Sequence, residues 1–389
     1  MPSASHSMNA PLGWQQLRHK PLRMFVAVMG IAFAVLLIMM QLGFRQALFE
    51  SAVRFHERFD YDIALFSPNS VFIVRPESFS IRRVYQSLSD PDVEAATPVY
   101  IFPAVWKNPW GEGRRSLNAV GFDPSRSVLS TPGFDESRHL LKQRDVVIFD
   151  SLSRPEFGEV ADFLRANGSV RTEVNNREIE VVGLFDMGTS FGIDGTIMTS
   201  VDNWLRLFPQ SNRNDIQLGL IQVKDGVDIG AVRDRLREYL PKDVLVMTKR
   251  EFVDRETNYW NRATPIGYIF AFGAIMGLVV GAIIVYQILF ADVTEHLNEY
   301  ATLRAIGYNN GFVAGIVLQQ AAVLGVIGFI PGVGASWFLY SRAAAATSLP
   351  LYVTPDRALL VFGLTIGMCA FSALLAVRKV ARIDPAEVF

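Results

Sequence analysis

The chain has 389 residues, of which 50% are hydrophobic and 19% are charged, and its mean hydropathy is +0.23. This composition is too apolar for a protein that is soluble throughout, so part of the chain is expected to lie in lipid. The net charge of −1 argues against nucleic-acid binding, which requires a basic excess on some domain. The single cysteine, Cys369, argues against a disulfide framework or a cysteine-based metal site.

Four apolar runs predict four membrane-spanning helices, because about 20 apolar residues suffice for a helix to cross a bilayer. The first run exceeds the roughly 7–15 apolar residues of a cleaved signal peptide, so it is expected to remain as an anchor. Pro331 predicts a kink or a break in the third helix. The predicted spans are residues 24–44, 263–291, 311–341 and 358–377.

Basic residues flank the first and last spans. Arg18, Lys20 and Arg23 precede the first span with no acidic residue among them, and Arg378 and Lys379 follow the last span. Lys and Arg in short flanking segments stay in the cytoplasm, so both termini are predicted to be cytoplasmic. The remaining segments are then a cytoplasmic N-terminal elbow (1–23), an extracytoplasmic domain (45–262), a cytoplasmic loop (292–310), a short outer loop (342–357) and a cytoplasmic tail (378–389).

The extracytoplasmic domain is predicted to be α+β, because strand-like and amphipathic helix-like segments follow one another along it. The fold class is therefore four transmembrane α-helices with a large α+β domain inserted between the first two. Two stretches each predict a β-α-β unit: strands 62–66 and 71–74, helix 80–88 and strand 98–106, then strand 217–223, helix 229–240 and strand 244–247. Further strands are predicted at 145–149, 178–185 and 196–199, with Asn175 and Asn176 at a hairpin turn.

Glycines recur at one helical face of the second span, at Gly273, Gly277 and Gly281. Such a face allows another helix backbone to approach closely. The partner is either another helix of the same chain or a second copy of the chain. The middle of every predicted span lacks Asp, Glu, Lys, Arg and His, which disfavours a proton- or ion-coupled secondary transporter.

One segment has the spacing of a hydrolase nucleophile motif. Residues 188–192 match G-x-S-x-G around Ser190 and follow a predicted strand. No helix is predicted after them, and the histidine downstream, His296, is predicted on the opposite side of the membrane, so a flexible glycine-rich loop is favoured over a serine hydrolase. The sequence also lacks the G-x-x-x-x-G-K-[ST] phosphate loop. We therefore predict no catalytic, cofactor or metal site in this chain, and ATP hydrolysis only in a partner.

The cytoplasmic loop is compatible with a short helix that continues to Ile306 and stops at Gly307. Leu297, Tyr300, Ala301 and Arg304 fall on one face of that helix. This face could enter a groove on a cytoplasmic partner. The alternative is that the segment is only a turn between two spans.

The residue pattern of this loop resembles that of the FtsX/MacB-type ABC permease family, in which E-x-(A/G)-x-L-(R/K)-A-(I/L)-G follows the second span. The tail resembles that family's closing signature, and residues 145–158 and 177–185 are similar to its periplasmic core. Within the family, the chain looks most like the DevC type, whose members carry no fused ATPase. The matching residues are Glu299, Ala301, Leu303, Arg304, Ala305, Ile306 and Gly307 in the loop, and Asp384, Pro385, Glu387 and Phe389 in the tail.

The resemblance implies a homodimer in the bacterial inner membrane, bound to two copies of a separate ABC ATPase that holds ATP and Mg. It further implies a periplasmic membrane-fusion adaptor, an outer-membrane duct and, as cargo, a lipid or other amphipathic molecule moved by mechanotransmission. The alternative is an FtsX-like signalling scaffold that controls a periplasmic cell-wall hydrolase. Carried over to this sequence, the ATPase-coupling residues are Glu299, Tyr300, Ala301, Leu303, Arg304, Ala305, Ile306 and Gly307.

Overall fold

The computed structural model describes residues 21–190 and 192–380 and divides into two compact units. Of the described residues, the helical unit comprises 21–46, 266–347 and 351–380. The α+β domain comprises Ala47–Pro265 together with Ser348–Pro350. The predicted elbow lies outside the described residues up to residue 20, and the tail signature from Asp384 to Phe389 lies outside them altogether.

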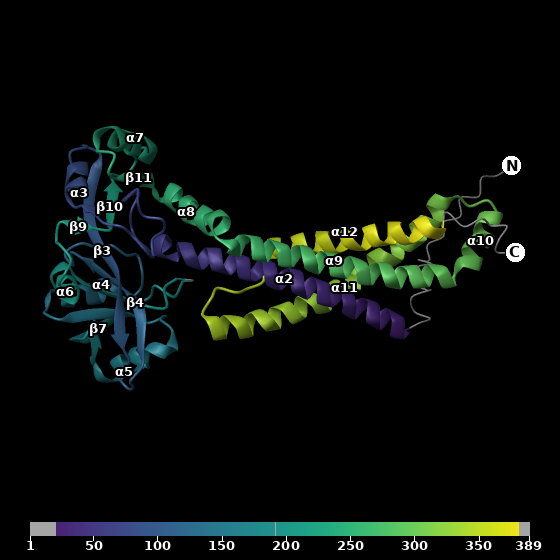
Figure 1. The fold of residues 1–389 in the computed structure, drawn as a ribbon, viewed down its shortest axis with the longest axis horizontal. Helices are drawn as coiled ribbons and strands as arrows, with labels where there is room; N and C mark the ends of the chain where they lie inside the picture. The colour runs from purple at the N-terminus through teal and green to yellow at the C-terminus, as the bar shows by residue number, and fades with distance from the viewer. Residues whose placement is uncertain (1–20, 191, 381–389) are drawn as a thin grey trace. The chain divides into compact units, whose positions relative to one another are not determined.

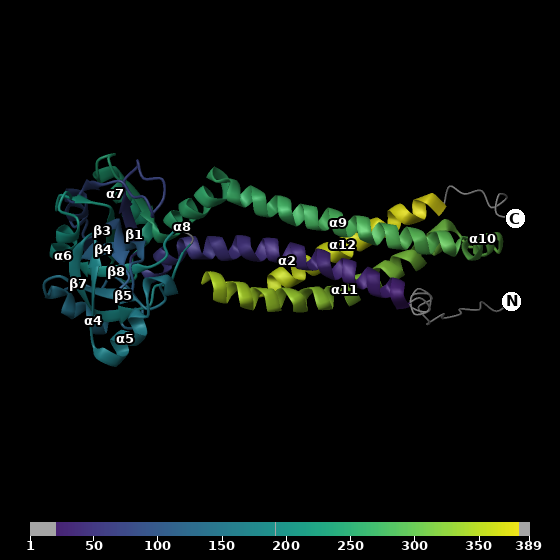
Figure 2. The ribbon, with the colours of Figure 1, turned by 60° about the horizontal axis from the view of Figure 1, so that its bottom comes forward.

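The four long helices of the structure correspond to the four predicted spans. They are α2 (Pro21–Arg58), α9 (Pro265–Glu295), α11 (Asn310–Thr347) and α12 (Pro355–Val380). Each is long and apolar enough to cross a membrane, and within the helical unit α2 lies beside α9 and α11 in both views (Figures 1 and 2). The α2 helix continues well past the predicted end at residue 44, because residues 45–58 keep a helix-compatible composition after the apolar run ends.

Pro331 does not break the third of these helices. The α11 helix is continuous through Pro331. Proline is tolerated inside membrane helices where neighbouring helices support the backbone around it. That support is visible at the next residue, Gly332, where a Cβ would lie only 2.7 Å from the Cβ of Val35 on α2. The predicted break is therefore wrong, and the alternative, a kink at Pro331, stays a prediction.

The α+β domain has two structural halves, and four antiparallel strands form the first of them. They are β1 (Ile63–Phe66), β3 (Val93–Lys107), β10 (Leu218–Val223) and β11 (Leu245–Thr248), in the order β11-β1-β10-β3. Helix α3 (Arg82–Ser87) connects β1 to β3, and α7 (Ile229–Tyr239) connects β10 to β11. The two predicted β-α-β units are thus present and interleave, since each places one strand between the two strands of the other, as in a ferredoxin-like split arrangement.

One strand prediction in this half is wrong. Residues 71–74 form turns rather than a strand. The backbone N–H of Ile73 donates to the buried carboxylate of Glu256, at 3.3 Å to Oε2, instead of to a neighbouring strand. A separate two-stranded ladder pairs β2 (Phe79–Ser80), which follows these residues in the chain, with β9 (Asp215–Ile216).

The second half of the domain is a ring of six strands. The order β3-β4-β8-β5-β7-β6 is closed by a pairing of β6 with β3 at Trp106 and Val174. The hairpin between β6 and β7 turns at Asn175 (φ 51°) and Asn176 (φ 62°), as predicted, because this turn type requires positive φ at both positions. The added strands are β4 (Arg114–Phe122), β5 (Val146–Asp150), β6 (Val170–Val174), β7 (Arg177–Phe185) and β8 (Thr196–Ser200).

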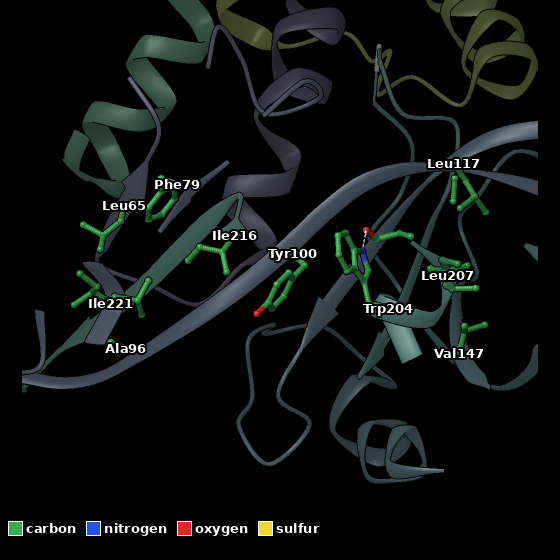
Figure 3. Packing of buried hydrophobic residues seen from close by; sticks show 14 of the residues in the cluster. Leu65, Phe79, Ala96, Tyr100, Leu117, Val147, Trp204, Leu207, Ile216 and Ile221 are labelled. Carbon is green, nitrogen blue, oxygen red and sulfur yellow. Dashed lines mark hydrogen bonds between the residues drawn. The ribbon is translucent and has the colours of Figure 1, made fainter. Parts of the chain in front are cut away.

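Strand β3 belongs to both halves. Its first part pairs with β10 up to Val99, and its second part pairs with β4 from Tyr100 onward. At this junction the rings of Tyr100 and Trp204 lie 5.1 Å apart, and the indole of Trp204 donates to the carbonyl of Ala119 at 3.1 Å. Figure 3 shows both rings in one cluster with apolar residues of the two halves. Burying two aromatic side chains stabilises the junction by several kcal/mol, at about 25 cal/mol per Å².

The remaining helices of the α+β domain pack against strands of the sheet, and α8 also leads back to the membrane helices. Helix α8 (Lys249–Asn258) begins with a capping box. The Thr248 side chain accepts the backbone N–H of Glu251, and the Glu251 side chain accepts the backbone N–H of Thr248. A π-helical turn (Tyr259–Ala263) follows it and leads to α9. The other helices here are α4 (Phe134–Ser137), α5 (Val160–Asn167) and α6 (Val201–Leu207).

Candidate functional site

The predicted coupling segment forms a separate helix. Helix α10 (Leu297–Ala305) follows α9 after the single residue His296 and lies at the end of the helical unit where α9 ends (Figure 1). Gly307 has φ 107° and no heavy atom within 4 Å of the place a Cβ would take. Because that backbone conformation favours glycine, the predicted helix stop at Gly307 is confirmed.

Two residues of the helix face that was predicted to meet a partner, Tyr300 and Ala301, are buried. Tyr300 is 1% exposed and Ala301 is 8% exposed, so both pack inside the helical unit. Burial, together with the nearby charges of Asp292 and Glu299, raises the pKa of the Tyr300 phenol. Adjacent aromatic and small side chains suit packing against helices of the same chain as well as they suit a groove on a partner. The spacing of the residues therefore did not distinguish these two roles. Leu303, Arg304 and Ala305 fall within α10, and their side chains lie outside the described part of the structure.

The solvent-facing residues of this segment are Asn298, Glu299 and Thr302 within α10, together with the residues after the helix. Ile306 is 71% exposed and Tyr308 is 43% exposed. The Tyr308 ring stacks on Phe312 at 4.4 Å. The segment that follows α10 therefore carries two exposed apolar side chains, Ile306 and Tyr308.

Polar contacts lie at the end of α9, directly before α10 begins. His296 Nδ1 lies 2.9 Å from the carbonyl of Asp292, and Arg23 at the start of α2 forms an ion pair with Glu295 at the end of α9. The hydroxyl of Tyr300 and Oδ2 of Asp292 are buried without a hydrogen-bond partner among the described residues. The predicted coupling segment therefore has polar contacts directly before its first residue and exposed side chains at its end.

The three predicted packing glycines contact helices of the same chain. A Cβ at Gly273 would lie 2.4 Å from Gln41, one at Gly277 would lie 3.2 Å from Leu37 and Ile38, and one at Gly281 would lie 2.6 Å from Ala34. All of these partners are on α2, and α12 adds Met368 against Gly281 at 2.5 Å. Of the two alternatives that the sequence left open, the structure thus favours intramolecular packing for this glycine face.

Ser190 does not form a nucleophile elbow. Residue 191 is not described, and residues 192–195, between it and β8, form no helix. The buried histidine of the α+β domain, His56, lies with its Nδ1 2.9 Å from the Tyr61 hydroxyl and not from Ser190. The loop is, however, more constrained than a flexible glycine-rich loop: Thr189 is 1% exposed, and the N–H of Gly188 donates to the buried carboxylate of Asp150 at 3.0 Å.

Sequence reasoning missed two buried charged residues, Asp150 and Arg357. Arg357, at the start of α12, is 6% exposed. It donates to the carbonyl of Tyr352 at 2.9 Å and to the hydroxyl of Tyr340 at 3.3 Å, and it also bonds Gln46. Its position directly after Pro355 and Asp356 at the edge of an apolar run was the available signal, because an arginine there must either reach water or find partners inside.

Comparisons with known proteins agree with this architecture. Residues 24–239 match the family described as MacB-like periplasmic core domain, and residues 271–385 match FtsX-like permease C-terminal. An uncharacterized ABC transporter permease of Mycobacterium tuberculosis is 23% identical over 312 residues, which cover 77% of this chain and 76% of the relative. The macrolide export ATP-binding/permease protein MacB 2 of Aeromonas hydrophila is 24% identical over 227 residues, covering 55% of this chain and 34% of that protein.

A solved structure, the periplasmic region of MacB from Actinobacillus actinomycetemcomitans, is 14% identical, covers 50% of this chain and 91% of that chain, and gives a TM-score of 0.33. The core-domain family alone matches more than half of the chain, over residues 24–239, and the permease family matches the remaining membrane helices. The chain therefore belongs to the MacB/FtsX-type family of ABC transporter permeases.

Proposed function

We propose that this permease is the membrane subunit of an ABC exporter that works by mechanotransmission. A homodimer of the chain in the bacterial inner membrane, with both termini in the cytoplasm, binds two copies of a separate ATPase. The ATPase holds ATP and Mg, and this chain binds no cofactor. A periplasmic membrane-fusion adaptor and an outer-membrane duct complete the path, and the cargo is a lipid or other amphipathic molecule.

The observation that carries the proposal is the form of the segment between α9 and α11. It is a short helix that begins directly after His296, which lies 2.9 Å from the carbonyl of Asp292. After the helix come Ile306, whose side chain is 71% exposed, and Gly307, which has positive φ. An apolar side chain this exposed gains by entering a groove on another protein. We assign Ile306, Tyr308 and Glu299 to the ATPase-facing surface, with Tyr300 and Ala301 as the packing that holds the helix in place.

The route for force follows the chain itself. Helix α9 is continuous from Pro265 to Glu295 and connects α10 to the π-helical turn and α8 of the α+β domain. A long unbroken helix transmits a displacement at one end to the other, whereas a single π-helical turn is a common place for a hinge. ATP-driven movement of α10 is thereby passed to the α+β domain.

The nature of the spans supports cargo handling outside the membrane core. The middle of each predicted span lacks Asp, Glu, Lys, Arg and His, so the spans offer no charged pathway for an ion or a charged solute. This is consistent with a machine that acts on cargo taken from the outer leaflet or the periplasm. The MacB-like match over residues 24–239 favours export over the FtsX-like signalling scaffold.

The test is a substitution at the proposed ATPase-facing surface. Ile306→Asp places a charge where the apolar contact is expected, and should reduce co-purification of the full-length chain with its ATPase at least tenfold. The matched control is Tyr239→Asp, which makes a similar change at a side chain of α7 that is 61% exposed. Unchanged association and ATP turnover in Ile306→Asp would remove the assignment.

A further inference from the structure

Three residues of the connection between α11 and α12 belong to the α+β domain. Ser348–Pro350 group with Ala47–Pro265, although the chain on either side of them groups with the helical unit. The connection is therefore a further place, besides α2 and α9, where the polypeptide of the membrane helices enters the α+β domain. What fastens these three residues decides whether a movement of the α11–α12 pair reaches the domain.

The side chain of Thr189 makes a polar contact to this connection. The hydroxyl of Thr189 donates to the backbone carbonyl of Ser348 at 3.2 Å. Thr189 is only 1% exposed, so water does not compete for this bond. Ser348 has φ 56°, a left-handed conformation that is unfavourable for serine and persists where the surroundings fix it.

The loop that carries Thr189 is shaped by Asp150. This residue lies at the end of β5 and is 0% exposed. Its carboxylate accepts backbone N–H groups of Leu152 at 3.1 Å, Met187 at 2.9 Å and Gly188 at 3.0 Å. A buried carboxylate requires such donors, and bonds of this kind are about twice as strong as neutral ones, so the loop has little freedom to depart from this shape.

Arg54 of α2 also bonds this loop. The Arg54 guanidinium, on the outer part of α2, donates to the carbonyl of Thr189 at 2.9 Å. Gly188 has φ 87°, and a Cβ there would lie 2.6 Å from Arg54 Nη1, so both the backbone conformation and the space require glycine. Thr189 thus contacts α2 through its backbone and the α11–α12 connection through its side chain.

We propose that residues 187–190 form a permanent mechanical link, in which Thr189 ties the α11–α12 connection to β5 and β7 and Asp150 is the positioning residue. The link stays closed throughout the ATP-driven cycle, since its polar groups are buried and bonded on both sides. Any displacement of the α11–α12 connection then moves the ends of β5 and β7. This role accounts for Gly188 of the G-x-S-x-G match without a hydrolase. The inference rests on the proposed mechanotransmission.

The test uses the full-length chain in complex with its ATPase in lipid nanodiscs. Hydrogen exchange is followed by mass spectrometry in the nucleotide-free and vanadate-trapped states, at residues 345–354 and at residues 181–190. In the wild type we expect both segments to respond to trapping. In Thr189→Val, which keeps the shape and removes the donor, the response should persist at 345–354 and fall at least threefold at 181–190, while ATP turnover is retained. Thr189→Ser, which keeps the donor, should restore the response.

An equal response of residues 181–190 in Thr189→Val and in the wild type would overturn the link. A second measurement tests its permanence: mild oxidation of the Thr189→Cys/Ser348→Cys pair, in a Cys369→Ala background, should give the same cross-linking yield in both states and leave ATP turnover unchanged. A yield that drops in one state contradicts a permanent link. If neither segment of the wild type responds although ATP is hydrolysed, the proposed mechanotransmission fails instead, so the two failures are distinguishable.

Discussion

The phenol of Tyr340 on α11 occupies the space that a side chain at Gly43 of α2 would need. A Cβ at residue 43 would lie 2.0 Å from the Tyr340 oxygen and 2.3 Å from the adjacent ring carbon. The same hydroxyl donates to the carbonyl of Met39, and Tyr340 is 1% exposed. The two helices are therefore held at a separation that only glycine permits at this point.

Gly43→Ala should consequently destabilise the helical unit. Overpacking of a buried contact costs about 1–3 kcal/mol, because Tyr340 must leave its rotamer or α2 must shift. Thermal unfolding of the detergent-purified chain should show a lowered midpoint. Gly363→Ala is the matched control, since nothing lies within 4 Å of its Cβ position on α12. Equal midpoints for the two variants would contradict the contact.

The stability of the α+β domain should depend on pH through Glu256. Burial raises the pKa of this carboxyl to about 7 from its ordinary value of 4.5, against smaller opposing effects of the Ile73 N–H, Trp260 and Arg255. The folded state therefore prefers the protonated acid. That stabilisation is complete below about pH 4.5 and is lost as the pH rises through about 7, by up to roughly 3 kcal/mol at about 1.4 kcal/mol per pKa unit.

Glu256→Gln removes this titration while keeping an amide oxygen for Ile73 and Trp260. Unfolding measured from pH 5 to pH 8 should show the wild type losing stability relative to Glu256→Gln across that range. Glu238→Gln, at an exposed position of α7, serves as the control and should track the wild type. A constant difference between wild type and Glu256→Gln at all pH values would show that Glu256 does not titrate there.

The hairpin between β6 and β7 should tolerate change at one of its two asparagines only. Asn175 accepts the N–H of Val105 at 2.9 Å and donates to the carbonyl of Leu207 at 3.2 Å, so its side chain caps an open edge of β3. Asn175→Ala loses both bonds and keeps an unfavourable positive φ, at a cost on the order of 2–3 kcal/mol. Asn176→Gly keeps the turn geometry and should stay within about 0.5 kcal/mol of the wild type. The two unfolding midpoints distinguish these expectations.

Features encoded in a short stretch of sequence were predictable. Apolar length gave the four spans, and the Asn175 and Asn176 pair gave the hairpin, because each depends on neighbouring residues alone. The glycine stop at Gly307 is of the same kind. The joining of the two β-α-β units into one sheet needed pairings between residues far apart in the chain, and local patterning does not determine those.

The candidate site was less predictable than the fold. Segment 299–307 was found through its resemblance to a family, but which side of α10 faces inward depends on the packing of Tyr300 against other helices. Residues 71–74 have the apolar pattern of a strand, and the distant carboxylate of Glu256 takes the N–H that a strand would use. Asp150 and Thr189 gave no local signal, since their partners lie at residues 187–188 and at Ser348.

The central claim is that α10 and the α+β domain stand on opposite sides of the membrane, so that a cytoplasmic motor can act on one and move the other. Single cysteines at Thr302, exposed on α10, and at Leu152, which is 49% exposed on the α+β domain, test it in a Cys369→Ala background. In intact spheroplasts, a membrane-impermeant maleimide should label Leu152→Cys at once and Thr302→Cys only after permeabilisation. Labelling of Thr302→Cys in intact spheroplasts at the rate of Leu152→Cys would contradict the account.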